Sequence, residues 1–250
     1  MPTSFPLLLG HRGVPSSSGS VAENTFAAFD LAVAQGCDGF EFDVRLTRDR
    51  RAVVCHDPRV KGVSISRATA AQLRLPQLHQ VVERYGQRVF LDIELKVKGL
   101  EPLVIDALRH YPPGRDFVVS SFLPEVLLEL KARSSRIPVG IICDQNSQIA
   151  KCCKLPVDYA IIHHSLLTRR LAQKVQAAGR KLIVWTVNSK RGMLRFAGYG
   201  VDAIITDRAP SAASLREVVA GRSGAPLAIR REFNGRATGR AAATAVATGR

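Results

Sequence analysis

A short apolar run followed by a helical pattern recurs eight times along this chain of 250 residues. The runs are Leu7–Leu9, Asp38–Arg45, Val89–Leu95, Phe117–Ser120, Val139–Ile142, Tyr159–Ile162, Leu182–Val187 and Ala203–Thr206. Strands that are each followed by a helix run parallel in one sheet, because the helix carries the chain back to the starting edge. Eight such units predict a closed (β/α)8 barrel, also called a TIM barrel. An open doubly wound sheet is the alternative.

Polar residues gather where the predicted strands end. They are His11, Glu41, Asp43, Glu94, Lys96, Ser121, His163, Trp185, Asn188 and Asp207. The active sites of barrel enzymes lie at the carboxyl ends of their strands. The pattern therefore favours the barrel and predicts that these side chains share one rim.

The second strand carries two acids at neighbouring inward positions. Glu41 and Asp43 alternate with phenylalanines, and because a strand has a side-chain period of two, both carboxylates leave the same face. Polar residues 47–51 then predict a turn, and residues 52–55 a second short strand. This hairpin extension would bring His56 back beside the acids. Adjacent buried acids are costly unless a cation or a proton-transfer role compensates for their desolvation.

A third acid, Glu94, completes a set of oxygen donors with Glu41 and Asp43 on a neighbouring strand. Oxygen ligands without cysteine suit Mg²⁺, Ca²⁺ or Mn²⁺ better than zinc. Lys96 lies two residues beyond Glu94 and points to the same face, where it could bind a phosphate oxygen or hold a carboxylate in place. Taken singly, each of these residues could also form an ordinary ion pair at the rim.

Two histidines, His11 and His56, flank this acidic site from different loops. A histidine pair can divide the roles of general base and general acid at neutral pH. Arg12 offers a planar fork for a phosphoryl oxygen. Trp185, the only tryptophan, either packs at its strand end or lines the pocket for an alcohol. One residue of the His163–His164 pair is expected to point to the rim.

The net charge of +15 is concentrated in part at the carboxyl terminus. Residues 221–250 carry six arginines and one acid and are rich in Ala and Gly. We therefore expect a folded domain over residues 1–220 and a disordered tail over 221–250. No zinc finger, RNA-binding signature or basic patch interleaved with aromatic residues appears, so a specific nucleic-acid partner is not expected. The charge favours only weak attraction to anionic surfaces.

The chain has no apolar run near the roughly 20 residues that span a bilayer. Its amino terminus lacks the charged and apolar regions of a signal peptide. The five cysteines are an odd number, which favours reduced thiols. These features predict a cytoplasmic protein without a membrane span, and they carry no prediction of its oligomeric state.

Several segments together resemble the glycerophosphodiester phosphodiesterase family. They are HRG at 11–13, ENTFAAF at 23–29, GCDGFEFDVRLTRD at 36–49, VVCHD at 53–57, LDIELK at 91–96, SSF at 120–122, VWTVN at 184–188 and GVDAIITDRAP at 200–210. The resemblance implies a (β/α)8 barrel that uses a divalent metal to hydrolyse glycerophosphodiesters, such as glycerophosphocholine or glycerophosphoethanolamine, to sn-glycerol 3-phosphate and an alcohol. It also implies site roles: catalytic His11 and His56, metal ligands Glu41, Asp43 and Glu94, and phosphate-binding Arg12 and Lys96.

The chain departs from the family pattern at two places. Ala22 stands where the family commonly has proline, and the segment 58–75, expected to cap the pocket, is shorter than usual. Two other functions stay open on the sequence. One is a lysophospholipase D-like phosphodiesterase, and the other is a non-catalytic barrel that binds phosphodiesters.

Overall fold

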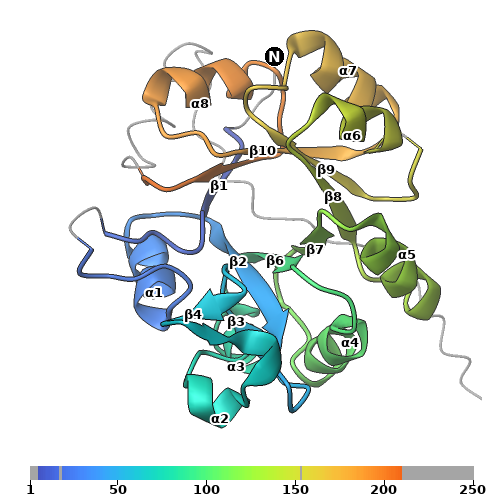
Figure 1. Cartoon of the computed structure of the whole chain (residues 1–250). Coiled ribbons are helices and arrows are strands. Elements are labelled where there is room, and N and C mark those ends of the chain that lie inside the picture. Colours follow the sequence, from blue (N-terminus) through green and yellow to red (C-terminus); the bar gives the residue numbers. More distant parts are fainter. Residues whose placement is uncertain (1–4, 17–18, 153, 210–250) are drawn as a thin grey trace, which may run out of the picture.

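Eight parallel strands form a closed barrel in the computed structural model, which describes residues 5–16, 19–152 and 154–209 (Figure 1). The strands are β1 (Leu7–Gly10), β2 (Gly39–Leu46), β6 (Phe90–Leu95), β7 (Phe117–Ser121), β8 (Val139–Cys143), β9 (Tyr159–His163), β10 (Lys181–Trp185) and β11 (Ala203–Thr206). Each strand pairs with the next, and β1 pairs with both β2 and β11. This last pairing closes the ring and confirms the barrel over the open sheet.

Helices connect successive strands and surround the barrel (Figure 1). They are α1 (Phe26–Ala34), α3 (Leu78–Tyr85), α4 (Glu101–His110), α5 (Pro124–Arg133), α6 (Asn146–Cys152), α7 (Arg169–Ala177) and α8 (Lys190–Ala197). Side-chain hydroxyl groups cap the amino-terminal ends of three of these helices. Thr25, Thr168 and Ser189 each accept a hydrogen bond from a backbone N–H of the first turn. Helix α3 begins at Leu78, where the side chain of Gln80 accepts a hydrogen bond from the backbone N–H of Gln77 and caps the helix.

The predicted hairpin follows β2. Strand β3 (Ala52–Val54) pairs antiparallel with the outer end of β2 and carries the chain back toward the barrel. Before α3 the chain adds the small hairpin of β4 (Arg59–Val60) and β5 (Val63–Ser64), the 3-10 turn Ile65–Arg67 and α2 (Ala70–Leu73).

An aromatic cluster outside the barrel fixes the orientation of β2. The rings of Phe29 and Phe40 stack with centroids 4.3 Å apart, and Tyr85 packs edge-on against Phe40 at 5.0 Å. Phe40 and Phe42 are fully buried against α1 and α3. Because alternate residues of a strand face opposite sides, this outer packing turns Glu41 and Asp43 into the barrel.

The barrel interior has an apolar part and an acidic part. Its apolar cluster comprises Leu9, Phe90, Val118, Ile142, Tyr159, Ile161, Ile183, Ala203 and Ile205. The acidic part lies on β2 and β6, where Glu41, Asp43, Asp92 and Glu94 are all buried. The site is therefore confined to one side of the barrel.

In the part of the chain that the structure describes, no helix is long and apolar enough to cross a membrane. The helical pattern predicted after the eighth strand and the tail predicted at 221–250 fall outside the described residues. The domain boundary at residue 220 therefore stays a prediction.

Candidate active site

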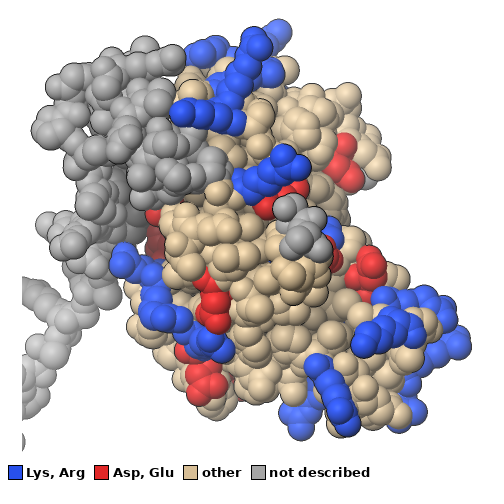
Figure 2. Space-filling model, turned by 90° about the vertical axis from the view of Figure 1, so that its left-hand side faces the viewer, with Lys and Arg blue, Asp and Glu red and all other residues tan. Residues whose placement is uncertain are grey.

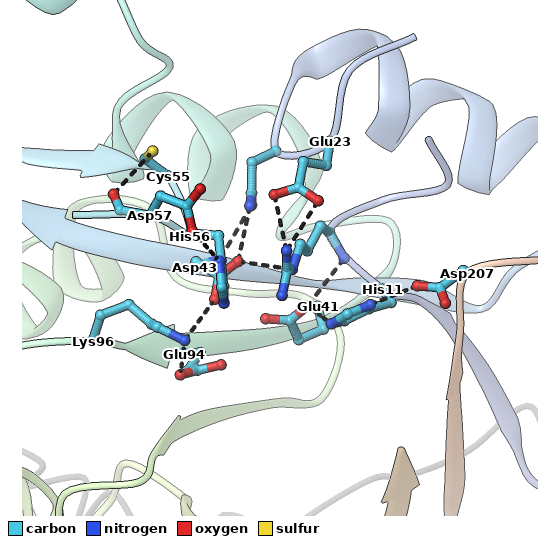
Figure 3. Close-up of polar contacts among 12 residues, drawn as sticks. His11, Glu23, Glu41, Asp43, Cys55, His56, Asp57, Glu94, Lys96 and Asp207 are labelled. Atoms are coloured by element: carbon cyan, nitrogen blue, oxygen red, sulfur yellow. Dashed lines mark hydrogen bonds and ion pairs between the residues drawn. The ribbon is translucent and has the colours of Figure 1, made fainter. Parts of the chain in front are cut away.

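Three buried carboxylates converge at the carboxyl ends of β2 and β6 (Figure 3). Glu41 and Asp43 come from β2, and Glu94 of β6 is the register partner of Asp43. One oxygen of each carboxylate lies within 4.8 Å of one oxygen of both others. Their side chains are almost inaccessible, with residue exposures of 4% for Glu41, 1% for Asp43 and 7% for Glu94. The predicted acidic cluster is therefore brought together as expected.

Burial and mutual repulsion separate the pKa values of these acids. Burial, followed by the charges of Asp43 and Glu94, raises the pKa of Glu41 well above its ordinary range. Burial and the charge of Asp43 raise the pKa of Glu94 to about 7. Burial would also raise the pKa of Asp43, but Lys96, the Asn24 amide and Arg12 together hold it below its ordinary value. Asp43 is thus the acid most readily ionised without a cation.

Lys96 and Arg12 supply the positive charges beside the acids. Lys96 Nζ lies 2.6 Å from Glu94 Oε1 and 3.2 Å from Asp43 Oδ1. Arg12 Nε lies 3.4 Å from Asp43 Oδ2, and its Nη1 donates to both carboxylate oxygens of Glu23 at 2.9 and 3.0 Å. Both cations are therefore held at the site by carboxylates, and Lys96 holds two carboxylates in place.

The loop after β1 positions Arg12 through unusual backbone geometry. Arg12 and Asn24 both adopt left-handed conformations, with φ of 55° and 57°. The Arg12 N–H donates to Glu41 Oε2 at 3.0 Å, while the Asn24 side chain donates to Asp43 Oδ2 at 2.8 Å and accepts from the Asp43 N–H at 3.2 Å. Left-handed backbone outside glycine is characteristic of functional sites whose surroundings hold it in place. The next residue, Gly13, has a φ of 80°, and a Cβ at this position would collide with the backbone of Ala28. Glycine is therefore the residue that fits there.

His11 lies at one end of the acidic cluster, beside Glu41 (Figure 3). Its Nε2 lies 4.0 Å from Glu41 Oε2, and its Nδ1 lies 2.6 Å from Asp207 Oδ1. Asn188 donates to the other oxygen of Asp207 at 2.7 Å and accepts from the Asp207 N–H at 2.9 Å. The hydrogen bond with His11 lowers the pKa of Asp207, so this carboxylate is ionised and accepts a hydrogen bond from Nδ1–H.

His56 lies at the other end, beside Asp43 (Figure 3). The β2–β3 hairpin places it there: the N–H of Cys55 donates to the Asp43 carbonyl at 2.9 Å, and Arg45 Nε donates to the His56 carbonyl at 2.7 Å. Its Nδ1 lies 2.8 Å from Asp57 Oδ1. The expected return of His56 to the acids is thus observed, and both histidines have a carboxylate at Nδ1.

Trp185 lies apart from the acids, at the end of β10. Its ring packs edge-on against Phe122 at 5.8 Å and against His163 at 5.1 Å. Its Nε1 is buried without a hydrogen-bond partner among the described residues. Lys96 Nζ lies 5.7 Å from the centre of the Phe122 ring, which links this aromatic group to the charged one.

Four residues of the site were not assigned roles from the sequence: Glu23, Asn24, Asp57 and Asp207. Asp207 was visible only as a polar strand end, and Asp57 as the neighbour of a histidine. Glu23 and Asn24 gave no separate signal, because their contacts depend on how the loop after β1 folds over β2. Asp92 was also missed. It lies below Glu94, is 1% exposed, and accepts from Ser120 Oγ at 2.6 Å.

The chemistry of the acidic cluster fits a hard divalent cation. Its donors are carboxylate oxygens only, and Glu41 Oε1 is buried with no hydrogen-bond partner in the described part of the chain. Burial, and after it the repulsion between the acids, raises the pKa values of Glu41 and Glu94. A cation would offset that repulsion.

Relatives with the same architecture are known. A glycerophosphodiester phosphodiesterase of Caldanaerobacter subterraneus subsp. tengcongensis is 30% identical over 80% of this chain and 93% of its own length. The human lysophospholipase D named GDPD1 is 38% identical over 62% of this chain and 50% of its own length. Among solved structures, a phosphodiesterase of Oleispira antarctica in complex with the product sn-glycerol-3-phosphate matches with a TM-score of 0.72 and 26% identity, covering 86% of this chain and 97% of the other.

The fold is a (β/α)8 barrel with acids, cations and histidines on one rim. The model of the "Glycerophosphoryl diester phosphodiesterase family" matches residues 11–104 and 103–210. This chain belongs to that family, and it is an enzyme of the phosphoric diester hydrolase class.

Proposed function

We propose that the enzyme hydrolyses glycerophosphodiesters such as glycerophosphocholine or glycerophosphoethanolamine to sn-glycerol 3-phosphate and an alcohol, by acid–base catalysis through His11 and His56. The observation that carries this proposal is the placing of the two histidines at opposite ends of the acidic cluster. An oxygen nucleophile adds to phosphorus at one end while the bond from phosphorus to the alcohol oxygen breaks at the other. Each event needs one proton transfer, which matches one histidine to each end.

The carboxylates beside Nδ1 of His11 and His56 support the assignment of one proton transfer to each histidine. An ionised Asp207 accepts a hydrogen bond from Nδ1–H of His11 and so leaves Nε2 directed at the site. Asp57 Oδ1 likewise lies 2.8 Å from Nδ1 of His56. One histidine then takes a proton at Nε2 from the attacking oxygen, and the other gives its Nε2 proton to the departing alcohol oxygen.

Glu41, Asp43 and Glu94 would hold one divalent cation, Mg²⁺ or Ca²⁺, with Mn²⁺ as a further candidate. When bound, such a cation offsets the negative charge that develops on the phosphoryl group. Lys96 and Arg12 border the same acids and would bind the remaining phosphoryl oxygens. Arg12 suits a planar, two-point contact, while Lys96 acts as a point charge.

Trp185 is proposed to line the alcohol side of the pocket. Its ring forms one group with Phe122 and His163, at the ends of β7, β9 and β10, and this group borders the charged side of the site where Phe122 lies near Lys96. The leaving alcohol would therefore contact a largely apolar wall while the phosphate contacts the charged one.

Release of glycerol 3-phosphate from glycerophosphocholine and glycerophosphoethanolamine tests the proposal. Activity should vanish with EDTA and return with Mg²⁺, Ca²⁺ or Mn²⁺. His11→Ala and His56→Ala should each lose about 10²-fold or more in kcat, because each removes one proton transfer. His110→Ala is the matched control, since this exposed histidine lies at the end of α4 beside Asp106. Full turnover in either site variant, with an unchanged melting temperature, would refute the assigned roles.

A second candidate substrate is a lysophospholipid, whose cleavage would make the enzyme a lysophospholipase D. The similarity to the human lysophospholipase D favours this candidate. Comparing kcat/KM for micellar lysophosphatidylcholine with that for glycerophosphocholine decides between the two. A clear preference for the lysolipid would select the second candidate.

We also propose that the enzyme works in the cytoplasm. The odd number of five cysteines supports a reducing compartment, where disulfides are rare. Cell fractionation with antibodies to the full chain tests this, and recovery outside the cell would overturn it.

A further inference from the structure

The segment between β3 and α3, residues 58–75, forms a lobe with a strongly one-sided charge. This basic lobe carries Arg59, Lys61, Arg67 and Arg74, and the sequence contains no acid from residue 58 to residue 82. All four cations are exposed. None forms an ion pair with an acid in the part of the chain that the structure describes. The lobe therefore presents uncompensated positive charge to a partner.

An apolar tip projects from the same lobe. Lys61 and Gly62 form the tight turn between β4 and β5, both with positive φ (47° and 80°), and this turn is followed directly by Val63. Val63 is 48% exposed, and it and Leu128 are the exposed large hydrophobic residues of the described chain. Two-residue turns with positive φ at both positions are rigid hairpin connections. The tip is thus held outward by the backbone.

An open groove of about 670 Å³ runs along the lobe. Its apolar lining includes Val60, Leu73 and Leu75, and its cationic lining consists of Lys61, Arg67 and Arg74. Three cations around a partly apolar groove favour a ligand that is anionic at one end and apolar at the other.

The basic lobe adjoins the mouth of the active site. It begins at Pro58, directly after His56 and Asp57. Hydrogen bonds from Arg48 N to the Ala68 carbonyl and from Ala70 N to Asp49 Oδ1 fix it against the turn between β2 and β3. Figure 1 places β4 and α2 at its lower left, and Figure 2, which views the molecule from that left-hand side, shows Lys and Arg side chains gathered at its lower right.

We propose that the basic lobe docks the enzyme on an anionic phospholipid bilayer, with the phosphate of one lipid head group in the groove and Val63 at the interface. Basic residues around an apolar tip match the two contributions to interfacial binding: attraction to anionic lipids and burial of apolar surface. A nucleic acid fits less well, because residues 58–75 contain no aromatic side chain on which a base could stack.

Docking in this way would keep the site mouth near the surface of a membrane. The inference goes beyond the proposed function, because surface binding depends on neither the histidines nor the acids of the active site. It is therefore tested without substrate turnover.

Co-sedimentation of the full chain with vesicles is the first experiment. Binding should be strong to an equimolar mixture of phosphatidylcholine and phosphatidylglycerol, weak to phosphatidylcholine alone, and reduced by salt. Because each cation near an anionic membrane contributes about fivefold in affinity, the triple variant Lys61→Gln, Arg67→Gln and Arg74→Gln should bind about 100-fold more weakly. Equal binding to both kinds of vesicle would overturn the proposal.

A matched control tests whether vesicle binding depends on the basic lobe or only on the net charge of the whole chain, including the tail. Arg115→Gln, Arg136→Gln and Lys154→Gln remove the same number of exposed cations at the opposite, amino-terminal ends of β7, β8 and β9. This control should bind vesicles like the parent chain. Equal losses in the two triple variants would show that net charge alone drives binding and would refute a docking site.

Two further readouts address the tip and the kind of partner. Val63→Ser should weaken vesicle binding at high salt, where charge contributes least, and no effect there would contradict insertion of the tip. Short duplex DNA should compete poorly with vesicles for the parent chain, and efficient competition through the same three cations would assign the lobe to nucleic acid instead. The melting temperature of the lobe variant, compared with that of the parent chain, reports its folding independently.

Discussion

Asp207 Oδ1 lies 2.6 Å from Nδ1 of His11, although the two residues are 196 positions apart in the chain. The contact exists because β1 and β11 are neighbours where the barrel closes. It fixes the orientation of the imidazole and directs Nε2 toward Glu41. Asp207 is therefore a positioning residue for His11 in the proposed mechanism.

Asp207→Asn should lower kcat about 10²-fold or more, with a smaller change in KM. The amide cannot stabilise an imidazolium as a carboxylate does, and its NH₂ group can force the wrong tautomer on His11. The split between kcat and KM separates this role from a structural one, because a general loss of structure would lower the melting temperature and change both parameters. A kcat near that of the parent chain would contradict the positioning role.

Metal affinity should fall as the pH decreases below about 7. Glu94, whose pKa is raised to about 7 without a cation, must lose its proton to become a ligand. Affinity should therefore decrease about tenfold for each pH unit below that value through Glu94, and more steeply where Glu41, whose pKa is also raised, binds a second proton. Calorimetric titration with Mg²⁺ or Mn²⁺ in two buffers of different ionisation enthalpy measures the released protons. Binding at pH 6 without proton release would show that Glu94 is already ionised.

Asp92→Asn should stabilise the protein in alkaline solution. Burial raises the pKa of Asp92 to about 7, and its Oδ2 is buried without a hydrogen-bond partner among the described residues. A carboxyl group whose pKa is raised on folding stabilises the native state below its unfolded pKa of about 4, and this contribution is lost as pH rises to about 7. The amide avoids this loss and can still accept from Ser120.

The expected gain for Asp92→Asn is about 1–3 kcal/mol in the free energy of unfolding at pH 8, and close to zero at pH 4. Denaturant unfolding of both proteins without metal, at each pH, measures it. A difference that does not change between the two pH values would contradict the assignment. Ser120→Ala serves as a comparison, since it removes the hydrogen bond and leaves the carboxylate.

Phe40→Ala should destabilise the fold by about 3–5 kcal/mol, because it removes a fully buried ring and leaves a cavity. Phe40 stacks on Phe29 and contacts Tyr85, so the loss also loosens α1 and α3 around β2. Thermal unfolding measures the cost. Leu128→Ala, at an exposed position of α5, is the control and should change stability by less than about 0.5 kcal/mol. Similar losses in both variants would contradict the role of the aromatic cluster.

The sequence predicted the acidic cluster for a local reason. Glu41, Asp43 and Glu94 lie on strands whose period of two is readable from the residues around them, and adjacent parallel strands bring their carboxyl ends together. His56 was predictable because only a short hairpin separates it from Asp43. The partners of these residues were not, since Asp207 and Asn24 reach the site through loops whose paths no local pattern specifies.

The sequence by itself determined the order of strands and helices, the closed barrel and the face on which the acids lie, because these follow from periodicity and from the rules of parallel connections. Only the tertiary structure decided which side-chain oxygen and nitrogen atoms of the site form hydrogen bonds and ion pairs with one another. The hydrogen bonds of Asp207 to His11 and of Asn24 to Asp43, and the pairing of Arg12 with Glu23, depend on left-handed backbone at single residues and on barrel closure. Those are contacts between distant parts of the chain, which a local pattern does not contain.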